Sequence, residues 1–240
     1  MTAVAVAILD RDSWDANTDI IVIADPERRQ LTWVPRDLWS PGAKDRISRA
    51  FALGGGPVLI AALNELGFPC KGLLCLRRGA TEAALSGLTV TVPVTEPLDF
   101  WYPLSPTAPI EEGRKAVSFK PPHEVLSGER LHQWIGARTM MHRAGSDLDR
   151  LARQQVLVRQ MLAAGIDFRA VLADPERVQT VGEPALPVLS RIDPSWTMTT
   201  FDAVDYATID GKRVLVRRAD RKRPSLWQRV RAGVRRSKRR

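Results

Sequence analysis

Residues 30–56 constrain the fold most strongly, because they predict a strand, a loop and a helix in immediate succession. The strand QLTWV stops at Pro35, and the charged pair Arg36 and Asp37 follows directly. The helical segment RISRAFAL is then closed by three glycines, at 54–56. In an open α/β sheet, ligands bind at the carboxyl ends of the strands. Arg36 and Asp37 are therefore expected at such an edge, either as a surface ion pair or as part of a phosphate site.

Short apolar segments alternate with amphipathic ones along much of the chain. Apolar runs predict buried strands at 3–9, 20–24, 72–76 and 88–94, and helical periodicity predicts helices at 45–53, 57–66, 79–85 and 126–135. This alternation is typical of an α/β sheet. The strands at 20–24 and 30–34 predict a hairpin, which would bring Asp19 and Arg36 to the same end of the sheet.

Two later segments carry further expectations. Residues 96–122 are rich in proline and aromatic side chains and predict a loop or lid, whose rings either pack onto the body or line an apolar pocket. Residues 145–162 predict a helix. In that helix Asp147, Arg150 and Gln154 are three and four residues apart and share one face. This face is either a solvated salt bridge or a binding face.

The C-terminal region is strongly basic. Residues 206–209 and 213–216, joined by an Asp-Gly turn, predict a β-hairpin. Residues 212–240 hold fourteen Lys or Arg and one acid, a net charge of +13, so the rest of this +9 chain carries −4. The tail at 220–240 also has an amphipathic pattern. It fits a segment lying on an anionic membrane, a nucleic-acid-binding tail or a disordered solubilising tail.

Composition excludes several classes of protein. A chain of 240 residues is long enough for one main domain with an appendage. Cys70 and Cys75 fit neither a zinc site nor a disulfide framework and are expected to be buried free thiols. The three histidines have no metal-ligand spacing. No apolar run approaches the ~18 residues of a membrane span, and the N-terminus lacks the basic start of a signal peptide, so neither feature is expected.

Six blocks of sequence resemble one family when taken in order. They are TDIIVIADP at 18–26, VPRDLW at 34–39, RISRAFALGG at 46–55, LSGLTVTV at 85–92, LSGERLHQWIGAR at 126–138 and SDLDRLARQQ at 146–155. Their order and rough spacing are similar to the LytR–CpsA–Psr family of cell-envelope proteins over about residues 15–165.

The resemblance implies a fold and an activity. The fold is a three-layer α/β/α sandwich with a mixed central sheet and a deep apolar pocket. It would span residues 1–190, followed by a C-terminal extension with a β-hairpin at 191–219 and the basic tail at 220–240. The activity is that of a phosphotransferase or pyrophosphatase. Such enzymes use Mg²⁺ to transfer a polyprenyl-pyrophosphate-linked glycan to a cell-wall polymer.

The resemblance also implies roles for single residues. Asp19 matches the acid that holds the metal. Arg36, Arg138 and Arg150 match arginines that act on the pyrophosphate. Substrate binding is expected from Arg46, Gln154 and Asp37. This assignment agrees with the chemistry of phosphoryl transfer, which needs a metal held by carboxylate and arginines that spread the charge of the phosphate oxygens.

The chain departs from the family pattern at several positions. Asn17 and Gly136 stand where the family has arginine, and Ser48 stands where it has asparagine. Loss of two arginines from a phosphate site could remove roughly 2–4 kcal/mol of transition-state stabilisation each, by analogy with lost oxyanion donors. The departures therefore favour a second interpretation, a non-catalytic relative that binds polyprenyl phosphate.

A third interpretation is a nucleic-acid-binding regulatory protein that acts through the basic tail. The same alternatives bear on where in the cell the protein is expected to act. The chemistry of the family and the basic tail predict a protein associated with a membrane surface, with the side of the membrane left open.

Overall fold

A computed structural model describes residues 2–105, 108, 110–142, 145–167, 169, 172 and 174–221. Most of the basic tail expected at 220–240 therefore lies outside the described residues.

The central sheet is mixed, as the resemblance implied. Its strands, taken over the described residues, have the order β12-β6-β1-β2-β3-β13. They are β1 (Val4–Leu9), β2 (Thr18–Asp25), β3 (Gln30–Trp33), β6 (Gly72–Leu76), β12 (Val178–Gly182) and β13 (Thr197–Thr200). The pairs β1–β6 and β3–β13 are parallel, whereas β1–β2, β2–β3 and β6–β12 are antiparallel. The predicted hairpin of β2 and β3 is confirmed.

Helices cover both faces of this sheet, which gives the predicted three layers. On one face α1 (Ile47–Glu65) packs Leu59 and Leu63 against Ile21 of β2. The other face is covered by α2 (Arg78–Leu85), α4 (Asp147–Ala163) and α5 (Leu186–Leu189), with Leu151 and Val188 in its core. Because both faces are covered, β1 and β6 are apolar along almost their whole length.

Helix α1 combines the two helices predicted at 45–53 and 57–66. Gly54 and Gly55 have non-helical backbone angles, and Gly55 has a φ of +66°, so the helix breaks at the glycine run. By length and composition α1 is the single helix among the described residues that could cross a membrane. Its buried side packs into the core of the domain, as a core helix of a folded domain does.

The predicted start of the first helix is wrong by two residues. Asp45–Arg46 forms a short strand, β5, that pairs with β4 (Trp39–Ser40), and the helix begins only at Ile47. A short polar segment can form either a strand or a helical turn. At 45–46 the pairing with β4 makes it a strand.

The segment 96–122, predicted as a loop or lid, contains two paired strands. Strands β8 (Leu98–Pro103) and β9 (Arg114–Phe119) pair antiparallel, and β11 (Thr139–Met140) extends them. The pattern in β8 alternates, because Phe100 and Tyr102 are buried while Trp101 is 43% exposed. Two strands, β7 (Thr89–Pro93) and β10 (His123–Ser127), form a second ribbon.

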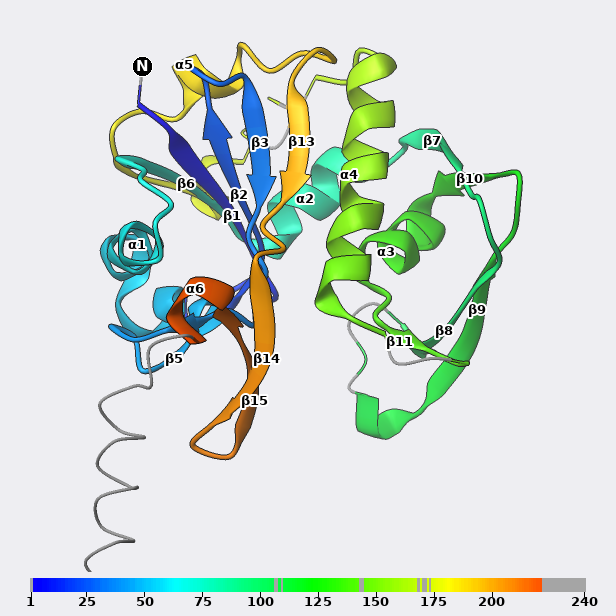
Figure 1. The fold of residues 1–240 in the computed structure, drawn as a ribbon. Helices are drawn as coiled ribbons and strands as arrows, with labels where there is room; N and C mark the ends of the chain where they lie inside the picture. The colour runs from blue at the N-terminus through cyan, green and yellow to red at the C-terminus, as the bar shows by residue number, and fades with distance from the viewer. Residues whose placement is uncertain are drawn as a thin grey trace, which may run out of the picture.

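The aromatic side chains of this region form a core of their own. Phe119 contacts Phe100 and Trp134 edge to face, with centroids 6.1 and 5.0 Å apart. Trp134 belongs to α3 (Gly128–Gly136), which covers the ribbon. Figure 1 shows α4 standing between this smaller layer and the central sheet. Phe100 and Tyr102 share this core with Leu157 and Met161 of α4, in line with the expectation of packing onto the body, whereas Trp101 is exposed.

The predicted C-terminal hairpin is present. It consists of β14 (Val204–Ile209) and β15 (Lys212–Arg217), followed by α6 (Arg218–Arg221). Asp210 and Gly211 have φ values of +49° and +77°, as the preferred two-residue hairpin turn requires. Strand β13, which lies in the segment expected as an extension, joins the central sheet.

Candidate functional site

The candidate site lies at one edge of the central sheet. Strands β1, β3, β6 and β13 run in the same direction, so their carboxyl ends meet there with the first residues of β2. Asp19 is the second residue of β2, Arg36 follows β3, and Arg78 follows β6. The amino end of α4 reaches the same edge (Figure 1). This is the edge at which open α/β sheets bind ligands.

Half of the site is buried. Asp19 Oδ1 accepts hydrogen bonds from Nη1 of Arg36 and, at 3.1 Å, from Nη1 of Arg150. Arg150 also donates to the backbone oxygen of Asp19 at 3.0 Å, and its Nη2 lies 2.8 Å from Asp147 Oδ1. The other oxygen of Asp147 accepts the backbone N–H of Arg36 at 3.1 Å. The side chains of Arg150 and Asp147 are 1% exposed. We call these four residues the buried cluster.

The charges of the buried cluster depend on one another. Burial by itself raises the pKa of Asp19, but the nearby charges of Arg150, Arg36 and Arg78 outweigh this effect and lower it below its ordinary value. Burial by itself lowers the pKa of Arg150, but the nearby carboxylates of Asp19 and Asp147 outweigh this effect and raise it above its ordinary value. Asp19 is therefore ionised and Arg150 charged throughout the physiological range.

The first turn of α4 explains why Asp147 points inward. Ser146 caps the helix, because its hydroxyl accepts the N–H of Asp149 and the carboxylate of Asp149 accepts the N–H of Ser146. Ser146 therefore occupies the N-cap position. Because Ser146 takes it, Asp147 is free to pair with Arg150, one turn along the same face.

The other half of the site is open to solvent. Asp37 lies between two arginines, with Arg138 Nη1 3.3 Å from its Oδ2 and Arg46 Nε 3.6 Å from its Oδ1. The side chains of Arg46 and Arg138 are 37% and 40% exposed. We call these three residues the open cluster. It adjoins the buried cluster through the peptide that joins Arg36 and Asp37.

The C-terminal hairpin supports the open cluster. The backbone N–H of Leu215 donates to the backbone oxygen of Asp37 at 2.9 Å. Arg46 Nη2 donates to the backbone oxygen of Arg213 at 2.9 Å, and Lys212 Nζ lies 2.6 Å from Asp45 Oδ2. Contacts from strand β15 therefore hold the segment between Asp37 and Arg46 in place.

The side-chain hydrogen bond of Gln154 goes to a residue outside both clusters. Its side chain is 3% exposed, and its Nε2 donates to the backbone oxygen of Ile135 at 3.1 Å, which ties α4 to α3. Its Oε1 is buried with no hydrogen-bond partner among the described residues. A carbonyl oxygen accepts hydrogen bonds, so in this orientation it does not suit a phosphate oxygen.

Two residues of the site were not predicted as site residues. Asp147 was predicted only to share a helical face with Arg150 and Gln154, which could not reveal its contact with Arg36. Arg78 lies close enough to Asp19 to lower its pKa and pairs with Glu82 at 2.7 Å. The available signal was its place just after β6, the same rule that selected Arg36.

Two positions where the family has arginine are occupied differently. Asn17 Oδ1 accepts a hydrogen bond from Arg49 at 3.4 Å, so a neighbouring guanidinium lies beside this position. Gly136 is exposed at the end of α3, and a Cβ atom built there would meet Tyr102 only at ordinary contact distance, 3.6 Å. No packing constraint at Cβ therefore excludes a larger side chain at Gly136.

The residues present fit Mg²⁺ only as an ion shared with a substrate. Within the described ranges, no three His, Cys, Asp or Glu side chains gather as a metal cage. Mg²⁺ is commonly bound by one or two carboxylates together with substrate phosphates and water. Asp19 can serve in this way, because its side chain is 25% exposed and both arginines contact only its Oδ1.

Two surface hollows lie outside both clusters. One, of ≈ 410 Å³, is lined by residues of the loop before β2, of α1 and of the chain around β12. The other, of ≈ 490 Å³, lies between the end of α2 and the start of α3. Neither of these two hollows contains a residue of the clusters.

Comparisons with known proteins agree with this fold. A model of the LytR_cpsA_psr family matches residues 4–184. Among solved structures, TagT bound to LI-WTA is 18% identical with a TM-score of 0.60, covering 90% of this chain and 84% of that one. TagV from B. subtilis is 17% identical with a TM-score of 0.59, covering 91% of each chain.

A third solved structure, of a protein described as a transcriptional regulator from Enterococcus faecalis, is 18% identical with a TM-score of 0.60. The match covers 90% of this chain and 81% of that one. Among curated proteins, none matches this sequence.

Proposed function

The chain belongs to the LytR–CpsA–Psr family of cell-envelope proteins, and from this premise we propose that it is a glycan phosphotransferase. Its substrate would be a polyprenyl-pyrophosphate-linked glycan and its acceptor a cell-wall polymer. The solved relative TagT bound to LI-WTA supports a glycan polymer as a partner.

One observation carries the proposal, namely that arginines from distant parts of the chain converge on a single sheet edge. Arg36, Arg46 and Arg138 are each between 29% and 40% exposed there. Planar guanidinium groups bind phosphate oxygens through paired, charge-assisted hydrogen bonds. A pyrophosphate at this edge would exchange their present carboxylate partners for its own oxygens.

The transfer step requires little covalent chemistry from the protein. The acceptor hydroxyl oxygen bonds to the phosphorus that carries the glycan, and the bond from that phosphorus to the bridging oxygen breaks. Polyprenyl phosphate leaves with the bridging oxygen and its electron pair, and in net balance takes the hydroxyl proton. Exposed arginines stabilise the charge that spreads over the phosphate oxygens during this exchange.

Arg150 has a different role from the exposed arginines. Its side chain is 1% exposed, and its contacts all go to Asp19 and Asp147. We assign it as a positioning residue that holds the Asp19 carboxylate and, through Asp147, the backbone of Arg36. Asp19 would hold Mg²⁺, which when bound neutralises charge on the phosphates.

The proposal is tested by measuring phosphate release from a short polyprenyl pyrophosphate, with and without Mg²⁺. We expect metal-dependent release by the wild-type protein, reduced about 10²- to 10³-fold in Arg36→Ala, as for the loss of one oxyanion donor. Arg159→Ala, an exposed arginine on α4, is the matched control and should match the wild type. Release that Arg36→Ala leaves intact would place the chemistry elsewhere.

A second candidate is a relative that binds polyprenyl phosphate without turnover. The glycine at 136 and the asparagine at 17 favour it, because both remove a cation from the expected phosphate site. Tight binding of the lipid pyrophosphate without phosphate release, in the presence of Mg²⁺, would select this candidate over the first.

Contact with a membrane surface is proposed through the basic tail, which lies largely outside the described residues. Vesicles with and without anionic lipid, tested with the full chain and with a chain ending at residue 221, address this point. Binding of duplex nucleic acid over a salt series tests the remaining interpretation of the tail.

A further inference from the structure

The hollow of ≈ 410 Å³ beside α1 is lined by both aromatic and polar side chains. Its lining residues are Trp14, Phe51, Gly55, Glu176, Val178 and Gln179. Its volume falls within the range of pockets that bind small molecules. The walls combine two aromatic rings with an amide, and they contain no lysine or arginine, which distinguishes this hollow from the arginine clusters.

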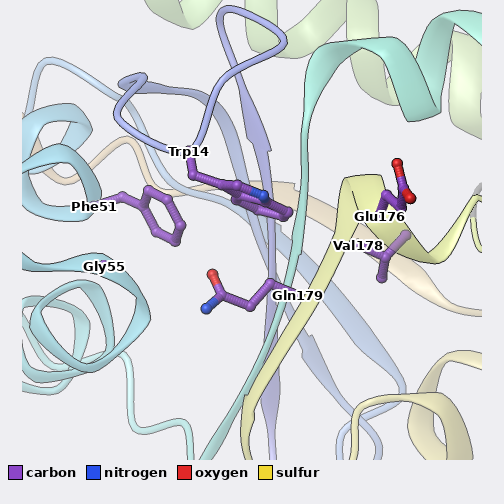
Figure 2. Close-up of a pocket in the computed structure, with 6 residues that line it drawn as sticks. All are labelled: Trp14, Phe51, Gly55, Glu176, Val178 and Gln179. Atoms are coloured by element: carbon purple, nitrogen blue, oxygen red, sulfur yellow. The ribbon is translucent and has the colours of Figure 1, made fainter.

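The register of β12 explains why Gln179 faces the hollow. Alternate side chains of a strand share one face, so Gln179 and Val181 both point toward α1. Val181 packs against the helix, where it would be the nearest neighbour of a Cβ atom at Gly56. Gln179 lies beyond this contact, and Figure 2 shows its amide pointing toward Phe51 and the turn at Gly55.

The break in α1 opens the other side of the hollow. Gly55 has a φ of +66°. For a Cβ atom built there, the nearest neighbour would be Cδ of Pro57, 3.9 Å away. The helix axis therefore changes direction at a residue that leaves the space beside it empty. Phe51, one turn earlier, is 2% exposed and forms an apolar wall.

Trp14 is held in place at the entrance. Its indole ring lies 6.3 Å from the ring of Phe51 and 5.3 Å from the guanidinium of Arg77. It is nevertheless 36% exposed, which is unusual for a side chain of this size. Within the described chain, neither the indole N–H nor the Gln179 amide has a hydrogen-bond partner.

We propose that this hollow binds one pyranose ring of a neutral glycan. A pyranose has an apolar C–H face, which suits the exposed indole of Trp14, and polar edges, which suit the Gln179 amide and the indole N–H. An acetamido group on the sugar would match the donor and acceptor of Gln179. An alkyl chain would leave these polar groups unpaired.

The hollow lies within reach of the arginine clusters. Trp14 and Asp19 are five residues apart in one continuous segment, so their Cα atoms are at most roughly 18 Å apart. A polymeric glycan could therefore contact both places. In that sense the inference deepens the proposed function, because it locates a subsite for the glycan of the same reaction, and for this role it rests on that proposal.

Direct binding tests the inference without any turnover. The full chain is titrated with chitotetraose, a soluble oligomer of N-acetylglucosamine, and with maltotetraose, by calorimetry. We expect saturable binding of at least one oligomer, weakened at least tenfold in Trp14→Ala and in Gln179→Ala. Trp101→Ala, which removes a similarly exposed tryptophan from β8, and Thr180→Ala, beside Gln179 on the strand, should bind as the wild type does.

Each outcome decides the inference. Gln179 is exposed and unpaired, so Gln179→Ala remains informative even if Trp14→Ala unfolds the loop. Binding of neither oligomer, or binding that Gln179→Ala leaves unchanged, overturns the inference. Saccharide binding without phosphate release from the lipid pyrophosphate would sustain it while the proposed function fails, and release without saccharide binding would do the reverse.

Discussion

The buried and open clusters use the same residue types for different ends. In the buried cluster, Arg150 and Asp147 are 1% exposed and their charged groups lie 2.8 Å apart. In the open cluster, Arg138 and Arg46 approach Asp37 only to 3.3 and 3.6 Å and remain well exposed. Breaking a buried ion pair is costly because it leaves an uncompensated charge, whereas exposed pairs contribute little.

This difference separates framework from binding surface. The buried cluster joins β2, the loop after β3 and the first turn of α4, so it fixes the shape of the sheet edge. The open cluster presents guanidinium groups that can change partners at low cost. An anion would therefore be expected to engage the open cluster and Arg36, while Arg150 remains in place behind them.

The largest effect is expected from Asp147→Ala. This change leaves the buried guanidinium of Arg150 with one carboxylate instead of two and should lower the free energy of unfolding by about 3–5 kcal/mol. Asp149→Ala, two residues along, removes only part of the helix cap and should cost about 1 kcal/mol. Urea unfolding of both variants measures this, and equal losses would contradict the high cost assigned to breaking a pair in the buried cluster.

The next prediction concerns pH. Because the pKa of Asp19 is lowered in the folded protein, its ionised form stabilises the fold above about pH 4, and this stabilisation is lost as the pH falls through the folded pKa. The unfolding free energies of the wild type and of Asp19→Asn should therefore converge as the pH is lowered from 7 to 3. Asp202→Asn, at an exposed site, serves as control. A gap that stays constant with pH would show that Asp19 acts by packing alone.

Arg138→Ala should change stability by less than about 1 kcal/mol, because its pair with Asp37 is exposed. The variant should nevertheless bind pyrophosphate much more weakly than the wild type. It lacks a guanidinium that can exchange Asp37 for a ligand. Thermal unfolding and a pyrophosphate titration of one sample give both values. A large stability loss without a change in binding would assign Arg138 to the framework instead.

A similarly small effect on stability is expected at Gly136, where the Cβ position is open. Gly136→Arg should alter the free energy of unfolding by no more than about 1 kcal/mol, the range of a glycine replaced within a helix. It should tighten pyrophosphate binding several-fold by restoring a cation beside Arg138. Gly136→Ala has the same helical effect without the charge, so equal binding by the two variants would exclude an electrostatic gain.

The sequence carried much of the fold because its strands obey local rules. Both β1 and β6 are apolar and short, and the hairpin of β14 and β15 has the Asp-Gly turn that its geometry needs. Strands β8 and β12 escaped prediction for a physical reason. Pro97 and Pro103 bracket β8, and β12 has the exposed polar residues Gln179 and Thr180 at its centre. Each becomes a strand only because a neighbouring strand supplies hydrogen bonds.

The sequence by itself determined which residues bracket the site, since Arg36 and Asp37 follow a strand and Asp19 begins its partner. Only the tertiary structure decided how they are used. Spacing on a helix relates Asp147 to Arg150, but it cannot show that Asp147 also accepts the N–H of Arg36, 111 residues earlier. Burial is likewise a property of the packed domain, and burial is what separates Arg150 as a positioning residue from Arg138 as a binding one.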